Sequence, residues 1–404
     1  MTENKTLTRD LRGTMSAQNI KTVRRDLGGV DGTTLYNSQI GGLIFCCGIV
    51  FKISSLPGLV SSVMHSATLW LYIFMCCLDI AMIAVLYSFA CSGADGYLTR
   101  TGNAAYRFFN AAACAYFMLK GFIYFVYTVI FLTIDLFVGI APFVIVTVLA
   151  VPVIYMGVKG IRGIARSGEA LAVVLFAIIV INLAFLKADM DFGRNLPLTA
   201  LPRGEFFKEG LRYSLWLGDL FPLMFVKVSK KKAPYVAIGT GAAYAVVLAI
   251  AMLAVAMYGN ALPYVYNMLI RIAGFNQLSL EIGRLEWAAL FVVLTMVILE
   301  LSLLFWGSAE SCKRATGSPL PAQLGFSALI VVATLAVPTL QDVVTFSVSP
   351  FGYAMFAAAC ALALGLIAFR CYAAKRGGTK KTAEAAADGT TAAENTEYTE
   401  GEKQ

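Results

Sequence analysis

The sequence has little of what catalysis and metal binding most often use. Histidine occurs once, at His65, and charged residues make up only 14% of the 404 positions. A lone histidine, expected in an outer loop, cannot complete a histidine-based metal site or a Cys–His or Ser–His pair. There is also no phosphate-binding glycine loop and no dinucleotide-binding glycine pattern after a strand. We therefore expect no enzymatic activity, no metal and no cofactor.

Cysteine occurs nine times, but with neither the spacing of metal ligands nor a disulfide framework. Most of the cysteines lie in apolar stretches, where this residue behaves as a small hydrophobe. The first 35 residues are polar and lack an apolar core, so no cleavable signal peptide is expected. Residues 1–35 are predicted to be a cytoplasmic N-terminal segment.

What the chain has in abundance is long apolar stretches. Hydrophobic residues make up 59% of it and the mean hydropathy is +0.74, which excludes an ordinary soluble domain. Ten stretches reach the roughly 20 residues that a helix needs to cross a bilayer. We expect an all-α integral membrane protein with about ten transmembrane helices over residues 36–373. The spans are predicted near 38–60, 67–91, 106–134, 139–158, 166–187, 210–228, 233–258, 284–307, 321–340 and 348–371.

The placement of basic residues predicts the orientation. Lys and Arg gather in the N-terminal segment and in alternate connections, around residues 100–107, 159–166, 227–232, 313–314 and 375–381. The positive-inside rule then places both termini in the cytoplasm, so the net charge of +8 is not taken as a sign of nucleic acid binding. Residues 374–404 change to Lys, Thr, Ala, Glu and Gly, a composition that predicts a disordered cytoplasmic tail.

Two predicted spans, the first and the sixth, are interrupted by glycine, proline and serine. Such breaks are tolerated where protein or a cavity satisfies the freed backbone groups. Breaks at matching positions in two five-span halves favour an inverted-repeat transporter fold with a binding site at the membrane midplane. The alternative is a pair of proline kinks in well-packed helices. The residues concerned are Gly48, Ser54, Ser55, Pro57 and Gly58 in the first span, and Ser214, Gly218 and Pro222 around Asp219 in the sixth.

The run from Leu196 to Gly317 resembles the endospore germination permease family, the B subunits of spore germinant receptors, in the amino acid–polyamine–organocation superfamily. The resemblance rests on the order of "LPLTALPRGEFFKEG", "YSLWLGDLFPLMF", "KVSKKK" and "LPYVYNMLIRIAGF…EIGRLEWAALF". The start of the first span, "SQIGGLIFCCGIVFKISSLPGLV", is similar more loosely. Lys52, near the first break, departs from the family pattern.

The resemblance implies a LeuT-like five-plus-five inverted repeat, with broken helices one and six around a small nutrient, commonly an amino acid. It also implies a larger membrane A subunit and a lipoprotein C subunit as partners, in the inner or cell membrane of a spore-forming bacterium. A different interpretation of the same site is a proton- or sodium-coupled secondary transporter of amino acids or amines.

The residues near the breaks are the candidates for ligand binding. Unwound helix starts present N–H groups that suit a carboxylate, and Asp219 suits an ammonium group. Trp216 and Phe221 could close over an aliphatic side chain, and Tyr124 and Tyr127 of the third span could form a wall, or simply pack. The full candidate set is Gly48, Ser54, Ser55, Ser214, Trp216, Gly218, Asp219, Phe221, Tyr124 and Tyr127.

Charged groups deep in spans call for partners, because each costs about 2.5–3.5 kcal/mol on insertion scales. We expect Lys52 to pair with Asp219 or Asp79, and Lys120 to pair with Asp79 or Glu300. Such a lysine could replace a sodium ion or carry a coupling proton. The alternative is a set of static ion pairs that hold the helices in register.

Glu281 and Arg284 stand three positions apart where the eighth span enters the membrane. Residues at this spacing face each other on a helix and can pair. We expect them to cap the helix and line a gate.

Overall fold

The computed structural model describes residues 33–54, 56–64, 67–133, 137, 139–186, 190–195, 203–228, 234–265, 267–275, 286–335 and 350–400. These residues form mainly α-helices, and eight helices among them are long and apolar enough to cross a membrane. They are Asn37–Ser54, Thr68–Ser92, Ala104–Phe131, Pro142–Lys159, Ile161–Ala184, Pro234–Tyr264, Glu286–Thr316 and Pro350–Lys375. The chain is thus compatible with an all-α, multi-pass membrane protein.

The sixth and ninth predicted spans are shorter than expected. Ser214–Phe225 and Leu320–Ala333 are apolar helical segments of 10–17 residues. The sixth is short because its backbone leaves the helical path around Gly218, whose φ is 73°. The ninth was predicted to reach residue 340, but residues 336–349 lie outside the described part of the chain.

The elements follow one another as an almost continuous series of helices. In order they are β1 (Thr34–Leu35), α3 (Asn37–Cys47), α4 (Val50–Ser54), α5 (Leu56–Met64), α6 (Thr68–Ser92), α7 (Ala94–Thr101), α8 (Ala104–Phe131), α9 (Pro142–Lys159), α10 (Ile161–Ala184), η3 (Phe192–Asn195), α11 (Arg203–Arg212), η4 (Ser214–Trp216), η5 (Phe221–Phe225), β2 (Lys227–Val228), α12 (Pro234–Tyr258), η6 (Gly259–Tyr264), α13 (Met268–Ala273), α15 (Glu286–Thr316), α16 (Leu320–Leu335) and α18 (Pro350–Glu400).

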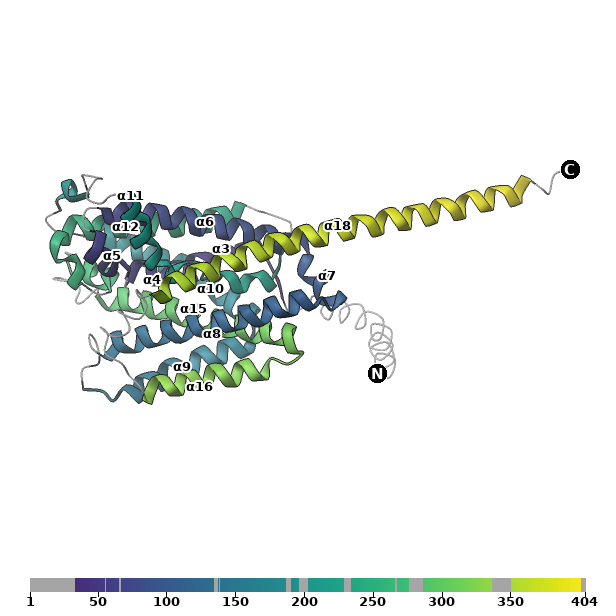
Figure 1. Ribbon diagram of the computed structural model, residues 1–404. Coiled ribbons are helices and arrows are strands. Elements are labelled where there is room, and N and C mark those ends of the chain that lie inside the picture. Colours follow the sequence, from purple (N-terminus) through teal and green to yellow (C-terminus); the bar gives the residue numbers. More distant parts are fainter. Residues whose placement is uncertain are drawn as a thin grey trace, which may run out of the picture.

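The long helices run along one common direction, with α7 at one end of the bundle and α5 and α11 at the other (Figure 1). Helix α15 packs against α8, α9, α10 and α16, and α3 packs between α10 and α12. The strands β1 and β2 pair in parallel, with Thr34 opposite Lys227. The backbone just before the first span therefore lies beside the backbone just after the sixth.

Glycines allow α3 to sit very close to its two neighbours. A Cβ atom on Gly41 would lie 2.5 Å from the Tyr235 carbonyl oxygen at the start of α12. A Cβ atom on Gly42 would lie 2.8 Å from the Glu169 Cα atom of α10. Small residues at helix contacts let backbones approach in membranes, where hydrophobicity alone does not drive association. Residues 41 and 42 thus fix the first span in the centre of the bundle.

The first and sixth spans are both interrupted, as their glycines and prolines predicted. Helix α3 ends at Cys47 and α4 begins at Val50. In the sixth span two short 3₁₀ helices, η4 and η5, flank an extended Leu217 and a left-handed Gly218. Both interruptions leave backbone groups outside regular helical hydrogen bonding, and the side chains that use them define the site below.

Helix α18 runs from Pro350 to Glu400, and its C-terminal part projects beyond the bundle (Figure 1). The disordered cytoplasmic tail predicted over residues 374–404 stays a prediction.

Candidate functional site

The turn in the sixth span exposes two carbonyl groups toward α8. The Leu217 carbonyl accepts hydrogen bonds from Lys120 Nζ at 2.5 Å and from the Tyr116 hydroxyl at 3.2 Å. The Leu215 carbonyl lies 3.3 Å from the Tyr124 hydroxyl. Buried carbonyls need such partners. The three α8 side chains therefore support the non-helical path of the sixth span.

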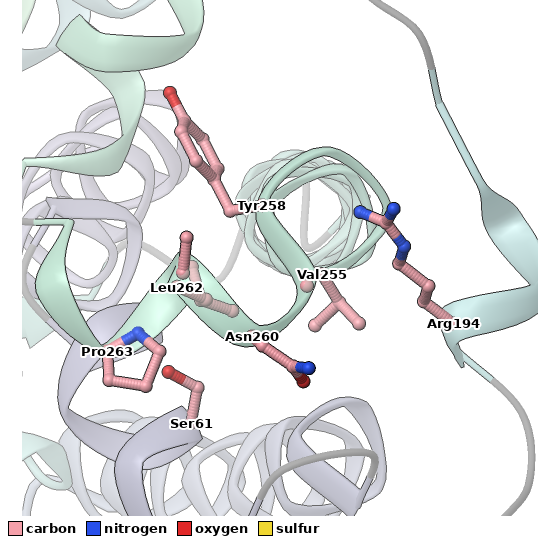
Figure 2. A pocket seen from close by; sticks show the side chains of 9 residues that line it. Ser61, Arg194, Val255, Tyr258, Asn260, Leu262 and Pro263 are labelled. Carbon is pink, nitrogen blue, oxygen red and sulfur yellow. The ribbon is translucent and has the colours of Figure 1, made fainter.

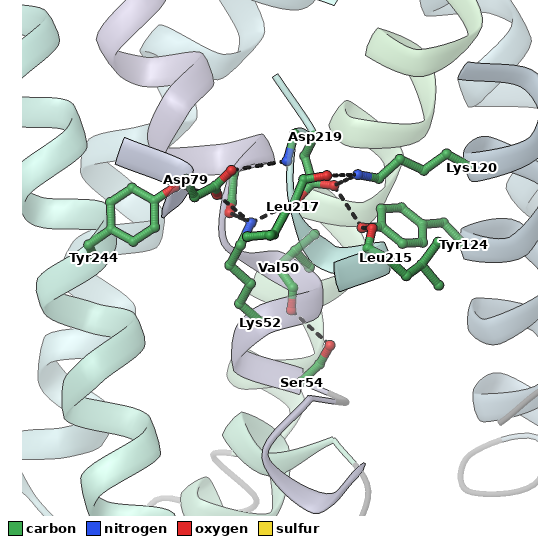
Figure 3. Close-up of polar contacts among 12 residues, drawn as sticks. Val50, Lys52, Ser54, Asp79, Lys120, Tyr124, Leu215, Leu217, Asp219 and Tyr244 are labelled. Carbon is green, nitrogen blue, oxygen red and sulfur yellow. Dashed lines mark hydrogen bonds and ion pairs between the residues drawn. The ribbon is translucent and has the colours of Figure 1, made fainter. Parts of the chain in front are cut away.

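Asp219 follows this turn and lies at the centre of a buried ionic network (Figure 3). Its Oδ2 atom is 2.7 Å from Lys52 Nζ, and its Oδ1 atom is 2.7 Å from Lys120 Nζ. The Tyr124 hydroxyl donates to Oδ1 at 2.7 Å. Two ammonium groups from α4 and α8 thus share one carboxylate.

Asp79 of α6 joins the network from the other side (Figure 3). Its Oδ2 atom is 3.0 Å from Lys52 Nζ and accepts from the Tyr244 hydroxyl of α12, while its Oδ1 atom accepts from the Gly218 N–H at 3.0 Å. Lys52 also donates to the Gly48 carbonyl at 2.6 Å. Its three ammonium protons therefore match three acceptors, two carboxylates and the carbonyl at the break in the first span.

The predicted partners of Lys52 are the ones observed, but the prediction for Lys120 was wrong. Lys120 pairs with Asp219 rather than with Asp79 or Glu300. The reason is the unwound sixth span, which carries Asp219 and the Leu217 carbonyl to α8. Glu300 of α15 is fully buried, and neither of its carboxylate oxygens has a hydrogen-bond partner among the described residues.

Aromatic rings form a wall beside Asp219. The Trp216 indole stacks on the Tyr124 ring, with centroids 5.3 Å apart and planes at 12°. The Phe51 ring contacts both of these rings: it stacks on Trp216 with centroids 5.6 Å apart and lies tilted against Tyr124 with centroids 3.9 Å apart. The Tyr127 ring meets the indole edge-on at 5.4 Å. All four side chains are buried. The carboxylate of Asp219 thus lies next to a broad apolar surface.

The remaining candidates are placed as follows. Gly218 is tightly enclosed, because a Cβ atom there would lie 2.5 Å from the ring of Phe221. Ser54 donates to the Val50 carbonyl and Ser214 to the Leu211 carbonyl, both bonds to backbone groups three or four residues earlier. Ser55, Glu281 and Arg284 lie outside the described residues, so their predicted roles stay predictions.

Sequence reasoning overlooked several tyrosines of the site. Tyr244 was not among the predicted site residues, yet its hydroxyl donates to Asp79. Tyr116 was missed too, although Tyr116, Lys120 and Tyr124 stand at i, i+4 and i+8. That spacing places three polar groups on one face of an apolar helix, which was the available signal. Tyr72, whose hydroxyl donates to the Lys52 carbonyl, had no comparable signal.

Electrostatically the network is balanced. Two lysine ammonium groups face two aspartate carboxylates, and every one of these groups is at least 97% buried. A buried pair repays its desolvation only when geometry and further hydrogen bonds are good, and removal of one partner leaves an uncompensated charge. A further cation at Asp219 would add one positive charge to this balanced site, because the displaced lysine would remain part of it.

Pockets lie toward both ends of the bundle. One of about 450 Å³ is lined by Ser61, Val255, Tyr258, Asn260 and Arg194 among others, where α12 passes into η6 (Figure 2). Arg194 lies 3.4 Å from Asp191 and donates to the Met257 carbonyl. None of the residues that line this pocket belongs to the ionic network.

A second pocket, of about 650 Å³, lies at the end of the bundle that carries α7. Its lining includes an ion pair between Asp95 and Arg314, to which Tyr106 and Glu310 also bind. The Arg314 guanidinium stacks over the Phe225 ring at 4.5 Å. This cluster ties α7 and α8 to the end of the sixth span.

The described part of the chain contains no group of three or more His, Cys, Asp or Glu side chains arranged to hold a metal ion. The chain matches no protein-family model and no curated protein.

Proposed function

We propose that this chain binds a small nutrient of the amino acid class, as the permease-like membrane subunit of a spore germinant receptor. The site would lie at the bilayer midplane, between the interrupted first and sixth spans of a ten-span, five-plus-five bundle. The observation that carries the proposal is Asp219 in a non-helical turn, held by Lys52 and Lys120. Irregular backbone at membrane depth is typical of a binding site.

The chemistry of the site suits a ligand with an ammonium group. Lys52 and Lys120 occupy the positions around Asp219 that a ligand ammonium would take. Binding would therefore displace a lysine, and an apolar ligand side chain would meet the wall of Trp216 and Tyr124. A ligand carboxylate would find the displaced ammonium and the freed N–H groups of the break. Such an exchange shifts the protein between two states.

In this proposal both termini are cytoplasmic, and partner A and C subunits report the change of state. The chain would lie in the inner or cell membrane of a spore-forming bacterium. The basic connections support the orientation, and the motifs of residues 196–317 support the receptor assignment.

A coupled secondary transporter of amino acids or amines is the second candidate. The observation that favours it is the number of ionisable groups buried together: two lysines, two aspartates and Glu300. Ionisable residues inside membranes often mark ion and proton pathways.

The test is a thermal-shift screen of the purified protein against amino acids, amines, nucleosides and sugars. A ligand at 100 times its dissociation constant should stabilise the native state by about 2.7 kcal/mol. Asp219→Asn should remove the shift, and Asp191→Asn, at a 61% exposed aspartate, should retain it. A shift that survives in Asp219→Asn would contradict the site. Uptake of the stabilising compound into proteoliposomes would favour the transporter.

A further inference from the structure

Glu300 differs from every other acid of the central site. Asp79 and Asp219 each receive several donors, from lysine, tyrosine or backbone N–H groups. Glu300 is 0% exposed, and both of its oxygens lack a partner among the described residues. An ionised carboxylate that is buried without a partner costs several kcal/mol. An ionised Glu300 would therefore need a compensating positive charge or hydrogen-bond donors from the groups around it.

The charged and titratable groups around Glu300 come from each side of the site. Lys52 of α4, Lys120 of α8, Asp79 of α6 and Asp219 of the sixth span act on it electrostatically. Cys47 of α3 and Tyr124 of α8 also interact with it electrostatically. The two ammonium groups are already matched by the two aspartates. An ionised Glu300 would leave one negative charge in excess.

We propose that Glu300 is a proton-binding site, which holds a proton while Lys52 and Lys120 are paired with the aspartates. With Glu300 as a neutral carboxylic acid, the two lysines and the two aspartates sum to zero net charge.

The proton can leave when the lysines lose a partner. If the ligand is an amine without a carboxylate and its ammonium takes Asp219, the displaced lysine ammonium needs a carboxylate, and Glu300 supplies one once its O–H bond breaks and the proton passes to water. One positive charge enters and one leaves, so the balance is kept. This step deepens the proposed function, because it assigns an exchangeable proton to the same site.

The experiment is infrared spectroscopy of the full chain in lipid nanodiscs at pH 7, without ligand. The wild type should show the carbonyl band of a protonated carboxylic acid, which shifts in D₂O. The band should be lost in Glu300→Gln and kept in Glu310→Gln, on the same helix, where Glu310 pairs with Arg314 at 3.1 Å. Labelling with ¹³C-glutamate should move the band in the unmutated protein, whereas ¹³C-aspartate should not. Absence of the band, or its survival in Glu300→Gln, would overturn the proposal.

Two further variants test the link to the lysines. Asp219→Asn leaves an ammonium in excess, so Glu300 should ionise and the acid band should disappear. Lys120→Met leaves no excess ammonium, and the band should stay. Persistence of the band in Asp219→Asn would overturn the proposed transfer of a lysine ammonium from Asp219 to Glu300. Loss of the wild-type band in sodium chloride but not in choline chloride would show that Glu300 binds sodium rather than a proton. Because no ligand is used, these results do not depend on the ligand screen.

Discussion

Lys52 and Asp219 are 167 positions apart in the sequence, and yet the Lys52 ammonium nitrogen lies 2.7 Å from the Asp219 carboxylate. Each residue stands beside an interruption, one in the first span and one in the sixth. The contact therefore joins the two segments at the points where neither is an ordinary helix.

The shared carboxylate predicts a strong coupling between Lys120 and Asp219. Lys120→Met should destabilise the protein by about 3–5 kcal/mol, because it leaves a buried carboxylate charge in excess. In the double variant Lys120→Met/Asp219→Asn the remaining Lys52–Asp79 pair is balanced. Its loss of stability should fall short of the sum of the single losses by about 0.5–3 kcal/mol. Unfolding in detergent measures both quantities, and Lys313→Met, at a 57% exposed lysine, is the control. Additive losses would show that the residues act independently.

Gly218 should tolerate no side chain. Its φ of 73° strains any L-residue, and a Cβ atom would lie 2.5 Å from the Phe221 ring. Gly317→Ala is the matched control, because Gly317 has a φ of 91° and no atom lies within 4 Å of a Cβ added there. The control should lose only about 1–2 kcal/mol of stability, the cost of the backbone conformation. Gly218→Ala should lose clearly more stability in thermal unfolding, and equal losses of stability would mean that the turn is not tightly enclosed.

Helix contact through Gly41 should be equally sensitive. Gly41→Ala places a Cβ atom 2.5 Å from the Tyr235 backbone oxygen, which cannot move without α12. We expect a lower melting temperature for this variant. Gly241→Ala lies on the same pair of helices, with nothing within 4 Å of the new Cβ atom, and should gain about 0.5–1 kcal/mol from its helix propensity. If both variants gain stability, α3 does not pack against α12 in this way.

The tyrosine hydroxyls should contribute measurably to the network. Tyr244→Phe keeps the ring and removes the hydrogen bond to Asp79. Hydrogen bonds to charged groups contribute about 1.5–3 kcal/mol, so the variant should lose stability in that range. Tyr235→Phe, at a 45% exposed tyrosine near the start of the same helix, should change little. Equal stability of Tyr244→Phe and wild type in denaturant unfolding would exclude a structural role for this hydroxyl.

The apolar stretches and the two interruptions could be predicted because their signals are local. Hydropathy over about 20 residues identifies a span, and the glycines and prolines around Gly48 and Gly218 mark the breaks. The partners of Lys52 followed from the count of buried charges. Those features depend on composition and spacing alone.

The partner of Lys120 could not be predicted in the same way. It depends on the path of the unwound sixth span, which turns Asp219 and the Leu217 carbonyl toward α8. Glu300 is likewise not among the carboxylates that contact the lysines, and its oxygens have no hydrogen-bond partner among the described residues. Tyr244 comes from a stretch dominated by small residues, where its side chain gave no sign of its partner.

The most direct test of the central claim is an experimental structure of the protein with the strongest compound of the thermal-shift screen bound. The account predicts density for that compound beside Asp219 and Trp216, with the Lys52 or Lys120 ammonium displaced from its present distance of 2.7 Å to the Asp219 carboxylate. Density only in the pocket around Arg194 and Asn260, with both lysine contacts unchanged, would contradict it.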